Sequence, residues 1–356
     1  TLQEANAIAK LDLNSLEIED IYSVGFEDYS KIAIDIDKKD EKYNAQTYDS
    51  LKGIRMPDAI SVYTVDGIDY LITANEGDSR DWNGYSNEIE VNFGKGKTSP
   101  TGKITADNSG LTGKITFFDT SDYDGLNNEN DYLFGGRSST IFKADEQSLQ
   151  EIYTTGNDFE VKTAAYLPNN FNCSNDDATI DDRSGKKGPE AEAVTIGQIE
   201  DKTFAFIGLE RIGGIMVYDI TNPEKTEFVN YINSRDFSTD IGGDDSPEGI
   251  HFIAGNDSIT GKPQLVVAYE VSGTVGVYDL TLQKNSDQSG DDKTDNPSQE
   301  PTVEETNNSS NTNTNNKNHS VNTGDASNIA ITIISLISTI VLITILMKKD
   351  KVLAED

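Results

Sequence analysis

The sequence predicts an all-β fold, a β-propeller, followed by a disordered linker and one transmembrane helix near the C-terminal end. Three observations lead to this prediction. Up to residue 281, short runs rich in Val, Ile, Thr, Tyr and Phe alternate with Gly, Asp and Asn, which is typical of strands and turns. A hairpin-sized segment recurs three times within this part. Residues 329–347 form an uncharged apolar run of 19 residues, long enough to span a bilayer as a helix.

The strand candidates are short and are bounded by turn residues. The clearest are residues 32–34, 70–73, 114–118, 204–207 and 265–267. Long helical periodicity is nearly absent, and residues 144–152 are the best helix candidate. The strand-rich part, residues 1–281, is therefore expected to form the globular domain.

Each copy of the repeat places one carboxylate at either end of a predicted hairpin. A carboxylate, a small residue and an aliphatic residue open the copy, and a strand that ends in glutamate closes it. The pairs, separated by 18, 18 and 22 positions, are Asp58 with Glu76, Glu192 with Glu210, and Glu248 with Glu270. Because one small sheet cannot bury both of its faces, repeated units stack, which favours propeller blades. Similar hairpins in a β-sandwich are the alternative.

Equivalent positions of successive blades surround one axis, so we expect the six carboxylates to gather. Like charges in a dry place must be neutralised by a proton, a basic side chain or a metal ion. Arg55, Arg80 and Arg211 lie close to three of them in the sequence and could form ion pairs. The alternative is a bound calcium ion, which prefers oxygen ligands.

Composition narrows the chemistry that the chain can perform. A formal charge of −33 argues against nucleic acid as a partner, because nucleic acid is itself a polyanion. With only Cys173, His251 and His319, the chain has neither a disulfide framework nor a histidine-based zinc site. A separate acidic stretch is either a solvated loop or an irregular calcium site. Its residues are Asp176, Asp177, Asp181 and Asp182.

Several motifs together resemble one family. They are Ala5-Asn6-Ala7-Ile8-Ala9, Met56-Pro57-Asp58-Ala59-Ile60, Thr73-Ala74-Asn75-Glu76-Gly77-Asp78-Ser79-Arg80, Gly135-Gly136-Arg137-Ser138, Gly188-Pro189-Glu190-Ala191-Glu192, Gly208-Leu209-Glu210-Arg211-Ile212-Gly213-Gly214 and Pro247-Glu248-Gly249-Ile250. They look like the choice-of-anchor I family of bacterial surface or secreted proteins, related to the mesenchyme-specific cell-surface glycoprotein group. The resemblance spans roughly residues 2–281 and implies a YVTN/WD40-like propeller. Because the family's propeller starts earlier, it also implies that the N-terminal blades are missing here.

The end of the chain predicts how the protein is held at the cell surface. Residues 282–319 are mostly Asn, Asp, Ser, Thr, Gln and Lys, which predicts a disordered spacer. Residues 320–325 read Ser-Val-Asn-Thr-Gly-Asp, and residues 326–356 contain the apolar run and a short basic tail. By the positive-inside rule the tail is cytoplasmic, so the rest of the chain is expected outside the cell.

This arrangement resembles a Gram-positive LPXTG-type sorting signal, although Ser320 and Val321 stand where Leu-Pro is usual. The resemblance implies that a sortase cuts between Thr323 and Gly324 and joins the protein to peptidoglycan. The expected location is then the cell wall, after an initial membrane-anchored stage. A plain membrane anchor is the alternative.

Two functions are compatible with these observations. The first is a binding or scaffold module displayed on the cell wall, and the scarcity of catalytic side chains favours this non-enzymatic function. The alternative is a calcium-dependent phosphohydrolase, similar in outline to alkaline phosphatases or phytases. In that case the six repeat carboxylates would bind the metal and Arg80, Arg137 and Arg211 would hold phosphate bidentately.

Overall fold

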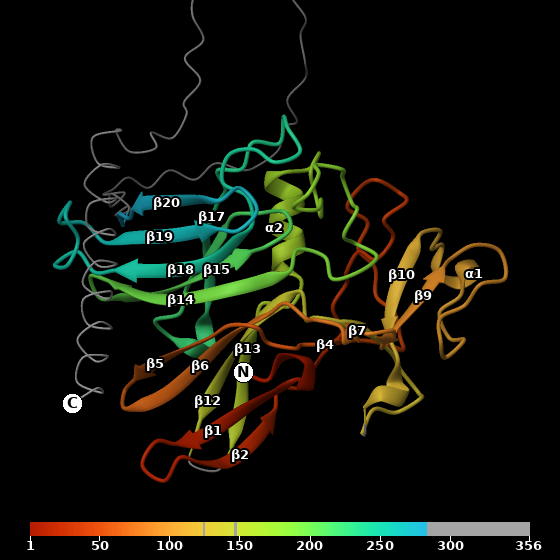
Figure 1. Cartoon of the computed structure of the whole chain (residues 1–356), viewed down its shortest axis with the longest axis horizontal. Helices are drawn as coiled ribbons and strands as arrows, with labels where there is room; N and C mark the ends of the chain where they lie inside the picture. The colour runs from red at the N-terminus through yellow and green to blue at the C-terminus, as the bar shows by residue number, and fades with distance from the viewer. Residues whose placement is uncertain (124, 146–147, 283–356) are drawn as a thin grey trace, which may run out of the picture. The chain divides into compact units, whose positions relative to one another are not determined.

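Strands make up most of the regular structure, as the sequence predicts (Figure 1). The computed structural model describes residues 1–123, 125–145 and 148–282, and residues 1–281 form one structural unit. Four of the five predicted strands are confirmed, whereas residues 32–34 contribute only an isolated bridge between Ile34 and Gln46. The helix expected over residues 144–152 is wrong, because the described residues there end one strand and begin the next.

Three antiparallel sheets contain the three copies of the repeat. The first has the order β13-β12-β6-β5, the second β14-β15-β16-β17 and the third β18-β19-β20. Their bounds are β5 Ile60–Val65, β6 Ile68–Asn75, β12 Ser138–Ala144, β13 Leu149–Thr154, β14 Ala191–Ile199, β15 Lys202–Leu209, β16 Ile215–Asp219, β17 Glu227–Ile232, β18 Pro247–Ile253, β19 Gln264–Tyr269 and β20 Thr274–Asp279. Each copy is therefore a hairpin: β5–β6, β14–β15 or β18–β19.

Smaller sheets and short helices complete the described part. β1 (Ala7–Asp12) pairs with β2 (Glu17–Ser23), β7 (Asp81–Trp82) with β8 (Tyr85–Ser86), and β9 (Glu88–Asn92) with β10 (Lys114–Phe118). A three-stranded sheet joins β3 (Phe26–Asp28), β4 (Leu51–Ile54) and β11 (Asp131–Phe134), with β11 parallel to β4. The helices are α1 (Ala106–Ser109), α2 (Asp158–Tyr166) and 3-10 turns at Gln3–Ala5, Thr120–Asp122 and Pro223–Lys225.

The propeller prediction is wrong. The described residues form seven separate sheets of two to four strands, with no closed barrel or propeller among them. The reason is that the repeat specifies a hairpin and not a blade. The outer strands of the second sheet follow its hairpin directly, whereas those of the first sheet come from residues 138–154, more than sixty positions later. The parallel β11–β4 pair also differs from the antiparallel meander of a blade.

An apolar core fills the space between the first two repeat sheets. Ile72 of β6, Ile207 of β15 and Met216 of β16 are almost fully buried there, together with Phe159 of α2. This packing fixes the two hairpins relative to each other, and β14 contacts both β5 and β6 on one side and β18 on the other.

Two buried arginines join segments that are distant in the sequence. Arg137 pairs with Glu160 of α2 at 2.6 Å, and both side chains are fully buried. Arg55 pairs with Glu27 at 3.0 Å and with Glu151 at 2.7 Å. Because a buried charge is costly unless it is paired, each arginine fixes the position of its partners.

The predicted linker, sorting motif and transmembrane run begin at residue 282 and lie outside the described residues, apart from residue 282 itself. Among the helices that are described, none has the length and apolar character needed to cross a bilayer.

Candidate functional site

The three hairpins bring the repeat carboxylates to one place. Two positions before the first carboxylate of each copy stands a non-glycine residue with positive φ: Met56 at 47°, Glu190 at 54° and Ser246 at 67°. Such left-handed conformations are rare outside glycine and concentrate at functional sites. The β14–β15 and β18–β19 pairings both shift register just after this residue. The same local irregularity therefore introduces each hairpin and directs its first carboxylate.

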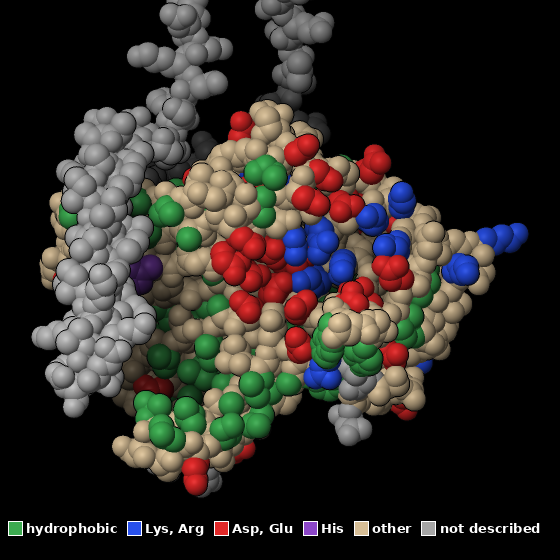
Figure 2. All heavy atoms as spheres, in the orientation of Figure 1, with side chains coloured by type: hydrophobic (Ala, Val, Ile, Leu, Met, Phe, Trp, Pro, Cys, Tyr) green, Lys and Arg blue, Asp and Glu red, His purple; other side chains and the backbone are tan. Residues whose placement is uncertain are grey.

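The carboxylates of the first two copies converge. Ligand oxygens of Asp58, Glu76 and Glu192 lie within 4.8 Å of one another, as do those of Glu76, Glu190 and Glu210. Glu248 lies close enough to Glu192 to act on its pKa, and the exposed Glu270 acts on the pKa of Glu248 in turn. We call the six residues Asp58, Glu76, Glu190, Glu192, Glu210 and Glu248 the acidic patch. Figure 2 shows acidic and basic side chains gathered next to each other on one face.

Lys187 lies at the centre of the charge balance. Its side chain is 7% exposed, and its Nζ lies 2.5 Å from Glu76 Oε1 and 2.6 Å from Glu190 Oε2. It also donates a hydrogen bond to the carbonyl oxygen of Gly77 at 2.7 Å. Glu190 is also paired with Arg183, and with Arg211 at 3.2 Å. One half of the patch is thus neutralised by three basic side chains.

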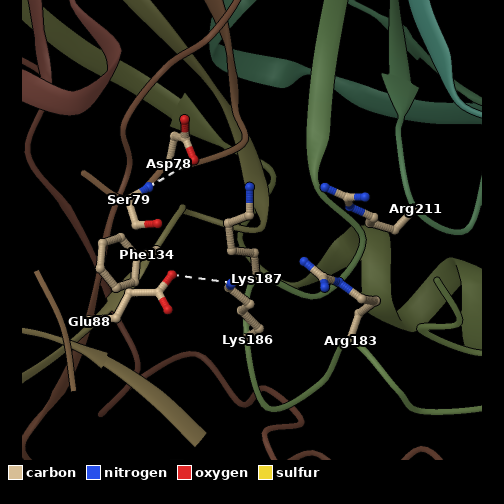
Figure 3. Close-up of a pocket in the computed structure, with 8 residues that line it drawn as sticks. All are labelled: Asp78, Ser79, Glu88, Phe134, Arg183, Lys186, Lys187 and Arg211. Atoms are coloured by element: carbon tan, nitrogen blue, oxygen red, sulfur yellow. Dashed lines mark hydrogen bonds and ion pairs between the residues drawn. The ribbon is translucent and has the colours of Figure 1, made fainter. Parts of the chain in front are cut away.

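These basic side chains border a pocket of about 170 Å³ (Figure 3). It is lined by Asp78, Ser79, Glu88, Phe134, Arg183, Lys186, Lys187 and Arg211, which we call the cation pocket. Lys186 pairs across it with Glu88 at 3.2 Å. Four cationic residues from the segment before β14 and the turn after β15 therefore converge beside the acidic patch.

Burial raises the pKa of three patch carboxyls above their ordinary value of 4.5. The pKa of Glu192 rises to about 9, because burial is reinforced by the charges of Glu76 and Glu210. The pKa of Glu76 rises to about 8 despite its contact with Lys187, and that of Glu210 rises to about 7.

Glu190 shows the opposite shift. Burial acts to raise its pKa, but Lys187, Arg183 and Arg211 outweigh burial and lower the pKa well below its ordinary value. Lys187 is thus shared between two carboxylates, and Glu190 is the one that stays fully ionised.

The other half of the patch has the chemistry of a metal site. Within the described part of the chain, Asp58, Glu192 and Glu248 form no ion pair at contact distance. They offer carboxylate oxygens to a half-exposed face, which suits a hard cation such as calcium.

Of the arginines that the sequence predicts to neutralise carboxylates or hold phosphate, only one lies at the patch. Arg211 lines the cation pocket and pairs with Glu190 and Glu210. Arg80 pairs with Glu4 at 3.5 Å and lies over the ring of Tyr123. Arg137 is fully buried and binds the backbone carbonyls of Asp35, Ser184 and Lys186, so the structure gives it a supporting role. Arg55 also serves other partners and does not neutralise Asp58.

Sequence analysis missed the residues that balance the patch. Lys187 and Lys186 come directly before the Gly-Pro that introduces the second copy, and Glu190 lies two positions before Glu192. This closeness to the repeat was the available signal. Lys187 is 111 positions away from Glu76, so the pair itself could not be read from the sequence.

A family profile described as the choice-of-anchor I domain matches residues 1–223, more than half of the chain. The chain belongs to the choice-of-anchor I family. The matched residues include the first two repeat copies, Lys187 and the cation pocket, and they end before the third copy. The resemblance seen in the sequence motifs is thereby confirmed for this part.

Two curated proteins are similar to this chain. A mesenchyme-specific cell surface glycoprotein of Strongylocentrotus purpuratus is 28% identical over 246 residues, covering 58% of this chain and 31% of the glycoprotein. Gigasin-3a of Magallana gigas is 29% identical over 168 residues, covering 42% of this chain and 57% of that protein. The chain therefore spans about a third of the length of the glycoprotein and somewhat over half of the length of gigasin-3a. The family and the surface glycoprotein indicate a cell-surface or extracellular location.

We predict that Lys187→Met strongly destabilises the fold, because it leaves Glu76 and Glu190 buried with less compensating charge. Removing one partner of a buried ion pair costs about 3–5 kcal/mol. Lys186→Met is the matched control, since Lys186 is part-exposed and its pair with Glu88 should be worth about 1 kcal/mol or less. Urea unfolding followed by circular dichroism measures both. Equal unfolding midpoints for the two variants would contradict the role given to Lys187.

We also predict that the metal-free protein becomes less stable as the pH rises. Glu76, Glu192 and Glu210 have folded-state pKa values above the ordinary value, so the folded state holds more protons than the unfolded state. This stability is fully present below the ordinary pKa of 4.5 and is lost progressively as the pH rises from there through the folded-state values of about 7 to 9. Melting curves in chelator should show the decline, with a shallower slope for Glu192→Gln. Glu227→Gln, an exposed change on β17, should follow the parent protein. A pH-independent melting temperature would overturn the assignment.

Proposed function

We propose that the chain is a surface-displayed binding module whose acidic patch holds calcium and whose cation pocket takes an anionic group of the ligand. One observation carries this proposal: carboxylates from the first two repeated hairpins, with Glu248 of the third near them, gather beside four cationic residues that border a pocket. The carboxylates would hold a metal ion on one side of the ligand's anionic group. The basic side chains of the pocket would contact the same group from the other side. Phosphate, sulfate and carboxylate groups all fit this chemistry.

The calcium ligands in this proposal are mainly the carboxylates without an ion pair, joined by Glu76, which Lys187 contacts through one oxygen. Asp58 and Glu192 supply two of them, and Glu76 can contribute an oxygen from the same group of three. Glu248 extends the donor set, while Glu270 is exposed at its edge. All these donors are oxygens, as calcium prefers.

The ion pairs of the pocket residues favour binding over catalysis. Arg211 and Lys187 hold Glu190, and Lys186 holds Glu88, so these cations are fixed in place by partners. The residues that line the described pocket include neither histidine nor cysteine, and His251 lies exposed on β18. A rigid charged surface of this kind is suited to recognition.

A calcium-dependent phosphohydrolase is the second candidate, because the same juxtaposition of carboxylates and cations could hold a metal and a phosphoryl group together. Turnover of a generic phosphate ester, measured with calcium and with chelator, separates the two functions. Calcium-dependent release of phosphate that disappears in Arg211→Gln supports the hydrolase. Binding of inorganic phosphate without turnover supports the binding module.

The proposed display uses the end of the chain. A sortase would cut between Thr323 and Gly324 and leave residues 1–323 joined to peptidoglycan, with residues 282–319 as the spacer. The support for this proposal is the order of the motif, apolar run and basic tail, together with family membership. Mass spectrometry of wall digests should find a C-terminal peptide that ends at Thr323 and carries a peptidoglycan fragment. A protein that retains residues 329–347 throughout would instead be a membrane-anchored one.

We predict that Glu192→Gln removes calcium from the acidic patch, because it takes away a ligand in the half without ion pairs. Calorimetric titration of the full chain should show one calcium ion fewer, or an affinity reduced by about tenfold or more, as expected when a charged ligand is lost. Glu227→Gln is the control and should bind calcium as the parent does. Identical calcium binding by Glu192→Gln and the parent would contradict the patch as a calcium site.

A further inference from the structure

A second group of carboxylates lies apart from the acidic patch. Asp35 and Asp40 belong to a loop between Ile34 and Gln46, whose ends are joined by two backbone hydrogen bonds of 3.1 Å. Asp181 comes from the segment that leads to the cation pocket. Ligand oxygens of these three aspartates lie within 4.8 Å of one another. We call them the aspartate triad.

The triad is buried and lacks a basic partner. Asp35 is 1% exposed and Asp181 is fully buried, while Asp40 is partly exposed. In the residues that the structure describes, none of the three forms an ion pair. Lys38 of the same loop pairs with Asp182 at 2.5 Å instead. Glu160, which accepts a hydrogen bond from the backbone nitrogen of Asp35, adds negative charge and is paired with Arg137. Three carboxylates therefore meet without an ion pair among the described residues, and Arg137 reaches Asp35 through its backbone carbonyl at 2.7 Å.

The hydrogen bonds of the triad leave specific oxygens unused. Asp181 Oδ1 accepts a hydrogen bond from the hydroxyl of Ser184, and Asp40 Oδ2 accepts one from the Asn44 side chain at 2.8 Å. The other oxygens, Asp181 Oδ2 and Asp40 Oδ1, are buried and have no hydrogen-bond partner. Buried polar atoms without a partner are rare and call for a bound ligand or a proton.

The hydrogen bonds of Asp35 act against a proton, although burial raises the pKa of this carboxyl group to about 7. Both of its oxygens accept backbone N–H groups, one from Asp37 at 3.1 Å and one from Asn44 at 2.5 Å. Such bonds favour the ionised form of a carboxyl group. A proton shared by Asp40 and Asp181 would satisfy those two and leave the charge of Asp35 uncompensated. A divalent cation satisfies all three carboxylates at once.

We propose that Asp35, Asp40 and Asp181 bind a structural calcium ion that joins the loop of residues 34–46 to the segment of residues 181–188. The three donors are carboxylate oxygens, and two of the residues, Asp40 and Asp181, each carry an oxygen, Oδ1 and Oδ2 respectively, that is buried without a hydrogen-bond partner. Hard oxygen ligands select calcium over zinc, and an irregular loop suits its flexible coordination. The aspartate triad thus forms a site that is distinct from the acidic patch.

The position of this site gives it a structural consequence. The segment that begins at Asp181 carries Arg183 and Lys187, which hold Glu190. Arg137 already binds the carbonyls of Ser184 and Lys186 in the same segment. Calcium at Asp181 fixes the start of the segment, so it stabilises the turn that presents the basic residues of the cation pocket.

The test compares calcium and chelator in melting experiments on the full chain. All variants carry Glu192→Gln, so that calcium binding at the acidic patch does not contribute to the melting temperature. The calcium proposal for the acidic patch is tested separately, by the titration described above. Calcium at a hundredfold excess over its Kd should raise the melting temperature by roughly 5 °C. Asp181→Asn should abolish this rise. Asp182→Asn is the matched control on the neighbouring residue and should keep it, since Asp182 pairs with Lys38 outside the triad.

The melting temperature in chelator gives a second test, in which Asp181→Asn should not lower the stability. In chelator, Asp181→Asn should melt at the same temperature as the reference protein or above it, because one of three repelling charges has been removed. A purely structural carboxylate would instead make the variant less stable under both conditions. If Asp181→Asn does not fold, Asp40→Asn on the part-exposed loop gives the same comparison.

Terbium luminescence locates the ion. Burial, with the nearby charges of Glu160 and Asp35, raises the pKa of Tyr43 to about 12, which places Tyr43 near the triad, and its ring contacts Phe171. Terbium in the triad should therefore emit when tyrosine is excited, emit less in Tyr43→Phe, and emit nothing above background in Asp181→Asn. Two results overturn the proposal: an unchanged calcium response in Asp181→Asn, or no response to calcium in the Glu192→Gln protein, which would leave the triad neutralised by protons.

Discussion

The arrangement of the site depends on one lysine that two carboxylates share. Lys187 contacts Glu76 and the Gly77 carbonyl at the end of β6, and it contacts Glu190 at the start of β14. The first two copies of the repeat are thereby joined through a buried ammonium group, in addition to their apolar core. Since a buried charge must be paired, the register of one hairpin against the other is fixed by electrostatics as well as by packing.

Sequence reasoning identified the hairpins because a hairpin is a local structure. Alternating apolar residues and turn residues determine β14–β15 and β18–β19 within about twenty positions. The assembly of sheets is not local: β12 and β13 join β6 after an intervening segment that forms other sheets, and β11 pairs in parallel with β4. The repeat therefore predicted the strands correctly and the propeller wrongly.

The candidate site also has a part that the sequence predicts and a part that it does not. A repeat that places carboxylates at equivalent ends of neighbouring hairpins predicts that they gather, and the four of the first two copies do. Proximity in the sequence pointed to Arg55, Arg80 and Arg211, and only Arg211 pairs with a carboxylate of the patch. Burial commits Arg55 to Glu27, and Arg80 pairs with Glu4. The ion pair that joins the first two copies links residues 111 positions apart, Lys187 and Glu76, and only the tertiary fold selects it.

The composition explains why buried carboxylates without basic partners occur at all. The chain has 62 acidic residues and 29 basic ones, so many carboxylates must remain unpaired. Most can face water, but those that the fold buries require a proton or a metal ion. At the cell surface calcium is a suitable counter-ion, since extracellular sites bind it with Kd values of about 10⁻⁴–10⁻³ M. An acidic chain of this kind can therefore gain both its solubility and its structural cations from the same excess of carboxylates.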